Sequence, residues 1–318
     1  EAAIVNDLKV FGVDNITQVI NYFDKGETLE QTIIDTRTEF NKSLNFPEFD
    51  FADVKGQESI KRCMEIAAAG GHNIILIGPP GSGKTMLAKR LPSILPPMTI
   101  REALETTKIH SVAGKTKDVG LMAQRPFRSP HHTASSVSLV GGGSYPQPGE
   151  ISLAHNGVLF LDELPEFKRE VLEVMRQPLE DREVTISRAK FTITYPSSFM
   201  LVASMNPSPG GYFNDPNAPV SSSPMEMQRY LSKISGPLLD RIDIHIEVTP
   251  VPFEKLTETR KAESSVEIRK RVFGVLFIGS AISGGGLGKG VNQAAAFDLL
   301  SPQDRVTFLA VIFQSILI

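Results

Sequence analysis

The sequence predicts an α/β fold in which a parallel sheet is sandwiched between helices. Short apolar runs of the kind found in buried parallel strands occupy residues 73–77, 158–161 and 199–203. Stretches with helical spacing separate these runs, which implies parallel crossover connections. Each run ends on polar residues, and ligands bind at the carboxyl ends of such strands. A fourth strand is expected over residues 242–248.

The elements around the first strand follow from local patterns. Residues 57–69 place Ile60, Met64 and Ala67 on one side of an expected helix. After the strand at 73–77 comes a glycine-rich loop, and then a helix over 84–91 that Pro92 ends. Nearer the start of the chain, residues 10–13 are expected to form a short strand and residues 16–23 a helix.

Composition sets broad limits. A chain of 318 residues with 41% hydrophobic side chains can bury a substantial core, and a net charge of −3 gives no overall basic field for nucleic acid. A local basic patch stays open. The lone cysteine, Cys63, excludes an intrachain disulfide, and a reducing cytoplasmic location is expected. No membrane span is expected, because the apolar run at 273–282 is short and contains glycine.

The glycine-rich loop reads Gly-Pro-Pro-Gly-Ser-Gly-Lys-Thr over residues 78–85. Glycines let successive backbone N–H groups converge on one concavity, which is how proteins hold phosphate oxygens. Lys84 can reach the β- and γ-phosphates, and the Thr85 hydroxyl can ligate Mg²⁺. The pattern with its flanking strand and helix predicts binding of ATP and Mg²⁺. The expected nucleotide-binding residues are Gly78, Pro79, Pro80, Gly81, Ser82, Gly83, Lys84, Thr85 and Met86.

Two acids, Asp162 and Glu163, close the second strand run. Adjacent carboxylates at a strand end point in different directions. One can therefore hold a magnesium-bound water while the other polarises the attacking water. We assign Asp162, with Thr85, to the magnesium and Glu163 to the catalytic base. An acidic pair of this kind would otherwise be an ordinary solvated loop.

Asn206 and Arg241 complete the expected catalytic set. Asn206 ends the third run and could place its amide beside the γ-phosphate, although Asn-Pro is also a common turn. Arg241 lies between a probable helix and a strand, where it could reach a neighbouring subunit's γ-phosphate. The alternative for Arg241 is a local salt bridge with Asp240 or Asp243.

Five segments carry a resemblance to a known family: residues 51–57, 78–85, 125–133, 148–163 and 235–243. Through them, residues 46–272 resemble the magnesium-chelatase-like AAA+ ATPases, and specifically their ComM/YifB branch. This resemblance implies a ring, expected to be a hexamer, with Asn206 as sensor and Arg241 as the intersubunit finger. It also implies that residues 1–45 are the tail of a Lon-like N-terminal domain, and the absence of a starting methionine fits a piece of a longer protein. Proteins of this branch are understood as DNA helicases for branch migration, so DNA and recombination proteins are expected partners.

Two insertions are expected. Residues 182–195 alternate apolar and polar side chains and predict a β-hairpin with Arg188 and Lys190 at its tip. In the resembling ATPases this insertion faces the ring pore, which makes both residues candidate DNA contacts; a solvated tip is the alternative. Residues 110–150 form the second insertion. Its histidine pair, His131 and His132, is expected to be structural or near the subunit interface rather than metal-binding.

The resemblance ends near residue 272. Residues 273–318 are glycine-rich and apolar and do not match the helical lid of the family, so this segment is left unassigned and no second sensor arginine is identified. Without that arginine we expect nucleotide binding with slow turnover and weakened ring assembly.

The main hypothesis is an ATP-driven motor acting on DNA. The alternatives are a magnesium-chelatase-type motor subunit that remodels a protein partner, and an ATP-binding regulatory or assembly protein that does not hydrolyse nucleotide.

Overall fold

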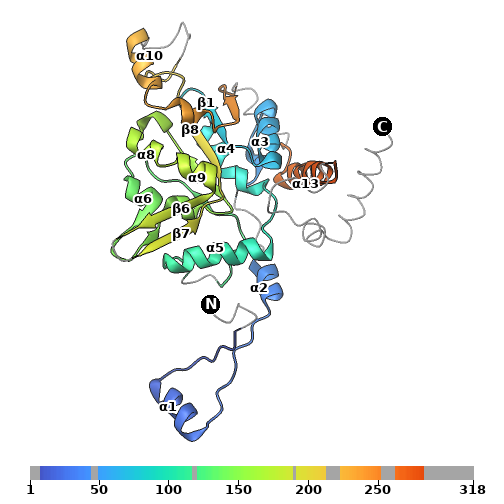
Figure 1. The fold of residues 1–318 in the computed structure, drawn as a ribbon. Helices are drawn as coiled ribbons and strands as arrows, with labels where there is room; N and C mark the ends of the chain where they lie inside the picture. Colours follow the sequence, from blue (N-terminus) through green and yellow to red (C-terminus); the bar gives the residue numbers. More distant parts are fainter. Residues whose placement is uncertain are drawn as a thin grey trace.

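The computed structural model describes residues 8–43, 49–116, 120–188, 191–212, 223–251 and 262–282 of the 318-residue chain. Its centre is a five-stranded parallel sheet with the strand order β2-β5-β8-β1-β9 (Figure 1). The strands are β1 (Ile74–Ile77), β2 (Phe127–Arg128), β5 (Val158–Leu161), β8 (Met200–Met205) and β9 (Ile244–Glu247). The predicted α/β sandwich is confirmed, with strand bounds shifted by one or two residues.

Helices cover both faces of the sheet because its strand residues alternate between two cores. Ile75, Leu159 and Leu201 point into one core, whereas Ile74, Phe160 and Val202 point into the other. The second core is closed by α3 (Glu58–Gly70), α4 (Lys84–Arg90), the 3₁₀ turn η3 (Leu91–Ser93) and α13 (Ser265–Ile282). The first is closed by α6 (Ser136–Val140), α7 (Glu150–Leu153), η4 (Leu164–Glu166), α8 (Arg169–Glu173), α9 (Arg176–Asp181), α10 (Pro224–Leu231) and α11 (Gly236–Leu239).

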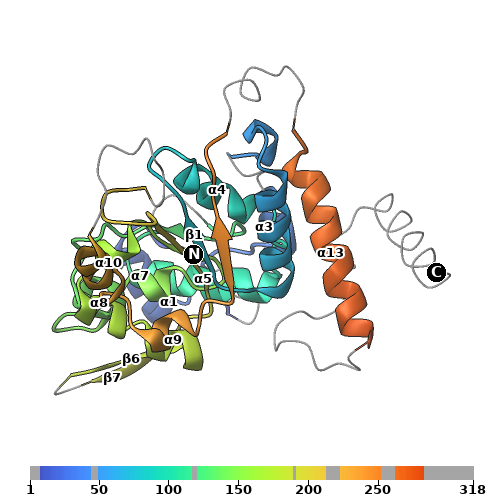
Figure 2. The ribbon, with the colours of Figure 1, turned by 90° about the horizontal axis from the view of Figure 1, so that it is seen from above.

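The last described helix, α13, packs along α3 (Figure 2). Ser265, at its start, donates its backbone N–H to Asp50 Oδ1 at 2.8 Å and accepts the Phe51 N–H at its hydroxyl, also at 2.8 Å. Arg271 pairs with Glu65 on α3 at 2.9 Å. The helix runs through residue 272, where the family resemblance ends, and residues 283–318 lie outside the described part of the chain.

Two short antiparallel hairpins, the insertion hairpins, lie outside the central sheet. One is β3 (Gly141–Gly142) with β4 (Gln147–Pro148), which forms only the end of the insertion expected over residues 110–150, and the other is β6 (Glu183–Ser187) with β7 (Thr192–Pro196). The β6–β7 pair confirms the hairpin expected over residues 182–195, and it projects from the edge of the molecule (Figure 2).

The segment before the sheet forms α1 (Ile16–Lys25), α2 (Thr36–Ser43) and the 3₁₀ turn η2 (Phe51–Asp53). The helix expected at 16–23 is confirmed and extends to Lys25. The strand expected at 10–13 is wrong: only a single bridge pairs Phe11 with Gln31. An isolated bridge has no neighbouring strand to extend its hydrogen-bond ladder, and α1 buries none of its residues.

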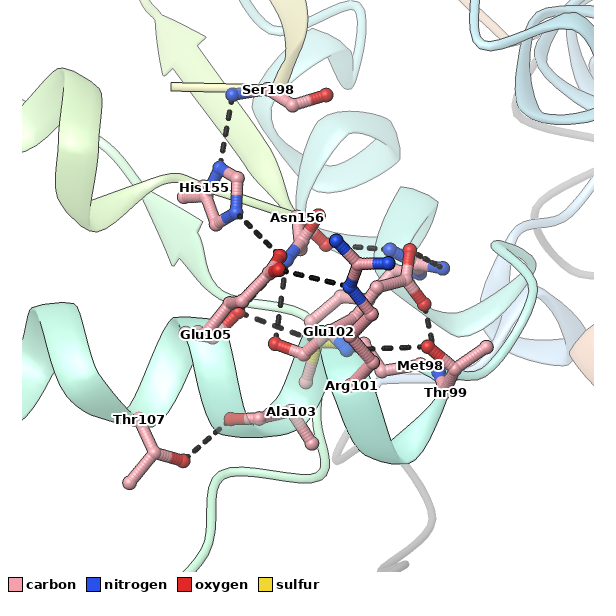
Figure 3. Close-up of polar contacts among 12 residues, drawn as sticks. Met98, Thr99, Arg101, Glu102, Ala103, Glu105, Thr107, His155, Asn156 and Ser198 are labelled. Atoms are coloured by element: carbon pink, nitrogen blue, oxygen red, sulfur yellow. Dashed lines mark hydrogen bonds and ion pairs between the residues drawn. The ribbon is translucent and has the colours of Figure 1, made fainter. Parts of the chain in front are cut away.

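Helix α5 (Ile100–Val112) lies beneath the amino edge of the sheet and is joined to it by polar contacts (Figure 3). The Asn156 amide donates to Glu102 O at 3.3 Å, and Arg125 donates to Asn156 O at 2.7 Å. Ser198 N–H donates to His155 Nδ1 at 3.0 Å, and His155 Nε2 lies 3.7 Å from Glu105. These contacts fix the start of β5 and β8, so the carboxyl ends of both strands hold their side chains in a set register.

Candidate active site

The glycine-rich loop runs from the carboxyl end of β1 to the first residue of α4. Gly81 and Gly83 have φ values of +76° and +91°, a left-handed backbone that favours glycine. Gly78 is fixed by space: a Cβ atom there would lie 2.2 Å from Val248 O, just after β9. The Ser82 hydroxyl is buried and has no hydrogen-bond partner within the described residues. The loop therefore has a backbone path that depends on glycine at three positions, Gly78, Gly81 and Gly83.

Lys84 joins this loop to the end of β8. Its Nζ donates to Gly78 O at 2.6 Å, to Pro79 O at 2.9 Å and to Asn206 Oδ1 at 3.1 Å. Burial lowers the pKa of Lys84, while the charges of Asp162 and Glu163 oppose that shift. The structure thus brings Lys84 and Asn206, 122 positions apart, into direct contact.

Asp162 lies beside the loop because β5 ends next to β8 and near α4. Thr85 Oγ1 donates to Asp162 Oδ2 at 2.9 Å. The Ser204 hydroxyl donates to the other carboxylate oxygen, Oδ1, from the neighbouring strand. A hydroxyl and a carboxylate oxygen in contact are a donor set suited to Mg²⁺ and its water ligands. The sequence analysis did not identify Ser204. Its position at the end of β8, which pairs with the strand that ends at Asp162, could have indicated it.

Glu163 sits at the rim of the site in a strained backbone position, with φ at +54°. Its side chain is 56% exposed, and His132 Nδ1 approaches its Oε2 at 3.5 Å. The His132 ring packs edge-on against Phe167, with ring centroids 6.4 Å apart. The histidine pair therefore includes a neighbour of Glu163, which the sequence did not indicate.

Two further residues hold the cradle in place. Gln57, in the left-handed region at φ +58°, donates from Nε2 to Ser82 O and to Thr249 O, each at 3.1 Å. Tyr230 donates its hydroxyl to Asn206 O at 3.0 Å, and burial raises the pKa of Tyr230 to about 12. Gln57 links the loop to the β9 side of the sheet, and Tyr230 fixes the turn after β8.

Arg241 lies at the opposite edge of the sheet from the loop. Its carbonyl accepts from Asn73 Nδ2 at 2.8 Å, and Asn73 precedes β1, whereas the loop follows β1. Four strand residues of about 3.3 Å each separate the two edges. The guanidinium pairs with Glu180 on α9, rather than with Asp240 or Asp243. Within one chain, Arg241 is therefore not part of the Lys84–Asp162 cluster.

Of the two candidate DNA contacts, only Arg188 can be placed. It follows β6, and its backbone N–H donates to Phe191 O at 2.7 Å. Lys190 lies outside the described residues. Among those residues, the structure contains no helix both long enough and apolar enough to cross a membrane.

The five-stranded parallel sheet, the glycine cradle ending on Lys84-Thr85 and the strand-end Asp162-Glu163 define an AAA+ P-loop ATPase domain. The sequence profile of the family described as magnesium chelatase, subunit ChlI, matches residues 50–256. The chain belongs to this family.

Named relatives agree with the family. The chain is 46% identical over 279 residues to the competence protein ComM of Haemophilus influenzae, covering 86% of this chain and 54% of that protein. It is 50% identical over 226 residues to the uncharacterized protein YifB of Escherichia coli, covering 71% of this chain and 44% of that protein. The chain spans about half the length of these relatives. Among solved structures, NtrX of Brucella abortus in complex with ADP aligns with a TM-score of 0.40 and 15% identity, over 79% of this chain and 45% of that one.

Proposed function

We propose that this chain is the ATP-hydrolysing part of a ring-forming motor that acts on DNA, of the ComM type that drives branch migration. The observation that carries the proposal is the meeting of Lys84, Thr85, Asp162 and Asn206 from three separate segments at one sheet edge. The name of the similar competence protein favours a role with incoming DNA. A cytoplasmic location and recombination proteins as partners belong to the same proposal.

The residues present fit ATP and Mg²⁺. Within residues 78–83, Gly81 and Gly83 adopt the positive φ values that a phosphate-binding loop uses, and the buried Ser82 hydroxyl is left without a partner in the described chain. Lys84 and residues 78–86 would hold the phosphates, while Thr85 and Asp162 would hold the magnesium directly and through water. When bound, Mg²⁺ neutralises charge on the phosphate oxygens.

The remaining steps belong to the protein's own side chains. Glu163, exposed at the rim, would accept the proton of the attacking water. Asn206 would hold that water in line with the γ-phosphate, and Lys84 would leave its carbonyl partners for the phosphate oxygens. Arg241 faces away from its own loop, so it would serve the nucleotide of a neighbouring subunit. This division of the site between subunits is why we propose a ring, with six copies as the expected number.

The second candidate is a chelatase-type motor that remodels a protein partner. The description of the matching family, a magnesium chelatase subunit, favours it. ATP turnover of the chain with and without single-stranded DNA separates the two functions. We expect DNA to stimulate turnover. Stimulation by a partner protein but not by DNA would favour the chelatase function, and ATP binding without any hydrolysis would favour a regulatory protein.

The same assay tests the assignment of Glu163. We expect Glu163→Gln to bind ATP normally and to lose turnover by at least about 100-fold, because a general base contributes that much or more. Glu166→Gln is a matched control, since Glu166 is similarly exposed three positions away and pairs with Lys233 at 3.4 Å. Unchanged turnover in Glu163→Gln would show that another group activates the water.

A further inference from the structure

The two insertion hairpins lie side by side, and each presents an aromatic ring to solvent. Tyr145, between β3 and β4, is 75% exposed, and Phe191, just before β7, is 44% exposed. Their ring centroids are 6.2 Å apart with planes inclined by 35°. Segments 46 positions apart in sequence therefore build one exposed aromatic pair. The β6–β7 hairpin, which carries Phe191, projects from the molecule (Figure 2).

This pair has a fixed support. The Tyr195 hydroxyl on β7 donates to Pro146 O, next to Tyr145, at 2.9 Å. A Cβ atom at Gly141 would lie 2.8 Å from Ile186 Cδ1, so β3 and β6 pack too closely there for any side chain larger than that of glycine. Ile186 and Tyr195 are themselves buried in the core beneath the sheet. The rings are thus exposed although the backbone that carries them is anchored.

A cation lies where the two hairpins meet. Arg188 precedes Phe191 on the same hairpin, and its Nη2 lies 2.8 Å from where a Gly142 Cβ would be, so the guanidinium reaches across to the first hairpin. Its Nη1 donates to Ser187 O at 3.2 Å. Within the described residues, the structure gives Arg188 no carboxylate partner. Its charge is therefore available to an anion at the junction of the two hairpins that carry the rings.

These features match single-stranded nucleic acid better than duplex. Aromatic rings stack on base faces, and a neighbouring cation binds the phosphate that follows the stacked base. Paired bases in a duplex hide their faces, so an exposed ring pair has nothing to stack on there. A purely electrostatic grip on the backbone would need the cation but not the rings.

We propose that Tyr145 and Phe191 form a stacking platform for unpaired DNA bases, with Arg188 binding the adjacent phosphate. The inference rests on the proposed function and adds to it that the bound DNA is single-stranded and that its bases are contacted directly. The motor then holds its DNA by bases as well as by backbone.

The test compares two labelled oligonucleotides, oligothymidylate and an equally long strand with the same backbone but no bases. Binding is measured by fluorescence anisotropy in the presence of a slowly hydrolysed ATP analogue and Mg²⁺. We expect the unaltered chain to bind the abasic strand about ten-fold more weakly, as loss of base stacking predicts. Tyr145→Ala and Phe191→Ala should each remove most of this preference, and Tyr145→Phe should keep it.

Phe23→Ala provides the matched control, because Phe23 is 77% exposed but lies on α1, outside both insertions. It should leave both affinities unchanged. Thermal unfolding of each variant checks that the hairpins stay folded. Analytical ultracentrifugation checks assembly, since loss of oligomers in the alanine variants would make the pair a subunit contact and overturn the proposal.

The remaining outcomes separate this inference from the proposed function. Equal binding of both strands, together with DNA-stimulated ATP turnover, would overturn the stacking platform and leave the motor intact. A base preference that persists in both alanine variants would place the stacking elsewhere and also overturn it. Absence of binding to either strand and of any DNA stimulation would contradict the DNA motor and the inference with it.

Discussion

At the residue scale, the carboxylate of Asp162 is held from two sides by hydroxyl groups. Thr85 contacts one oxygen from α4, and Ser204 contacts the other from β8. Ser204 also lies 3.3 Å from the Glu163 N–H, as its acceptor. One serine thus contacts the Asp162 carboxylate and the Glu163 backbone, and it is almost fully buried, at 1% exposure.

Removing this hydroxyl should weaken the metal site without unfolding the chain. We expect Ser204→Ala to lower ATP turnover or the apparent Mg²⁺ affinity by roughly 10- to 100-fold, which is typical when a partner of a metal ligand is lost. Turnover measured across a Mg²⁺ titration would show the effect as a higher metal requirement. A uniform fall in turnover at every Mg²⁺ concentration would argue against a role in orienting Asp162.

At the element scale, two buried histidines join α5 to α7 and to the segment before β8. His110 Nε2 lies 2.9 Å from Leu153 O on α7, and His155 Nδ1 accepts from Ser198 N–H before β8. Burial lowers the pKa of both, and for His155 the attraction of Glu105 opposes this only in part. A proton on His155 Nδ1 would face an N–H donor, so the folded chain favours the neutral ring.

This arrangement predicts loss of stability in acid. In the unfolded chain a histidine has a pKa of 6.5, so below that pH the unfolded state binds protons that the folded state does not. Stability present above pH 6.5 should therefore fall as the pH drops through it. We expect a lower Tm at about pH 5.5 than at about pH 7.5.

A substitution at His155, which contacts Glu105 of α5, tests how much of this pH dependence comes from that histidine. His155→Gln retains an acceptor for Ser198 N–H and cannot take up a proton, so its Tm should fall less in acid than that of the unaltered chain. His245 is exposed on β9, so the Tm of His245→Gln should fall in acid as much as that of the unaltered chain. An equal fall in the His155 and His245 variants would show that His155 does not contribute.

At the scale of the whole molecule, the expected catalytic residues are divided between the two edges of the sheet. Lys84, Thr85, Asp162, Glu163 and Asn206 lie at the carboxyl edge, and Arg241 lies at the amino edge. An arginine side chain is shorter than the four-residue strand β1, so Arg241 does not reach the loop of its own chain, and the proposed function assigns it to a neighbouring chain. Arg241 pairs with Glu180 in the isolated chain.

Mixing two inactive variants tests this division. We expect Arg241→Ala to bind ATP but to lose turnover by roughly 1,000-fold or more, the usual contribution of such an arginine. Lys84→Ala should also lack ATP turnover, because it cannot hold the phosphates. Mixed assemblies pair an intact loop with an intact Arg241, so activity should return in part. Arg101→Ala, 89% exposed on α5, should keep its activity. No recovery on mixing would mean that Arg241 does not act across subunits.

Local patterns in the sequence determined the elements and much of the chemistry. Short apolar runs predicted β5 and its neighbouring strands, because a strand that is buried on both faces needs apolar side chains whatever its position in the sheet. The loop at 78–85 could be recognised because its function depends on backbone freedom, which glycine spacing records directly. The strand predicted at residues 10–13 was wrong, because a short apolar run does not show whether a partner strand exists.

The tertiary structure decided what depends on side chains far apart in the chain. Strand order brought Ser204 beside Asp162 and His132 beside Glu163, and no local spacing contains those distances. It also paired Tyr145 with Phe191 and set Arg241 at the edge opposite Lys84. The sequence by itself therefore determined which chemical groups are present and on which elements. Only the packing of the sheet decided which of them meet, because contacts between distant segments depend on crossover topology rather than on neighbouring residues.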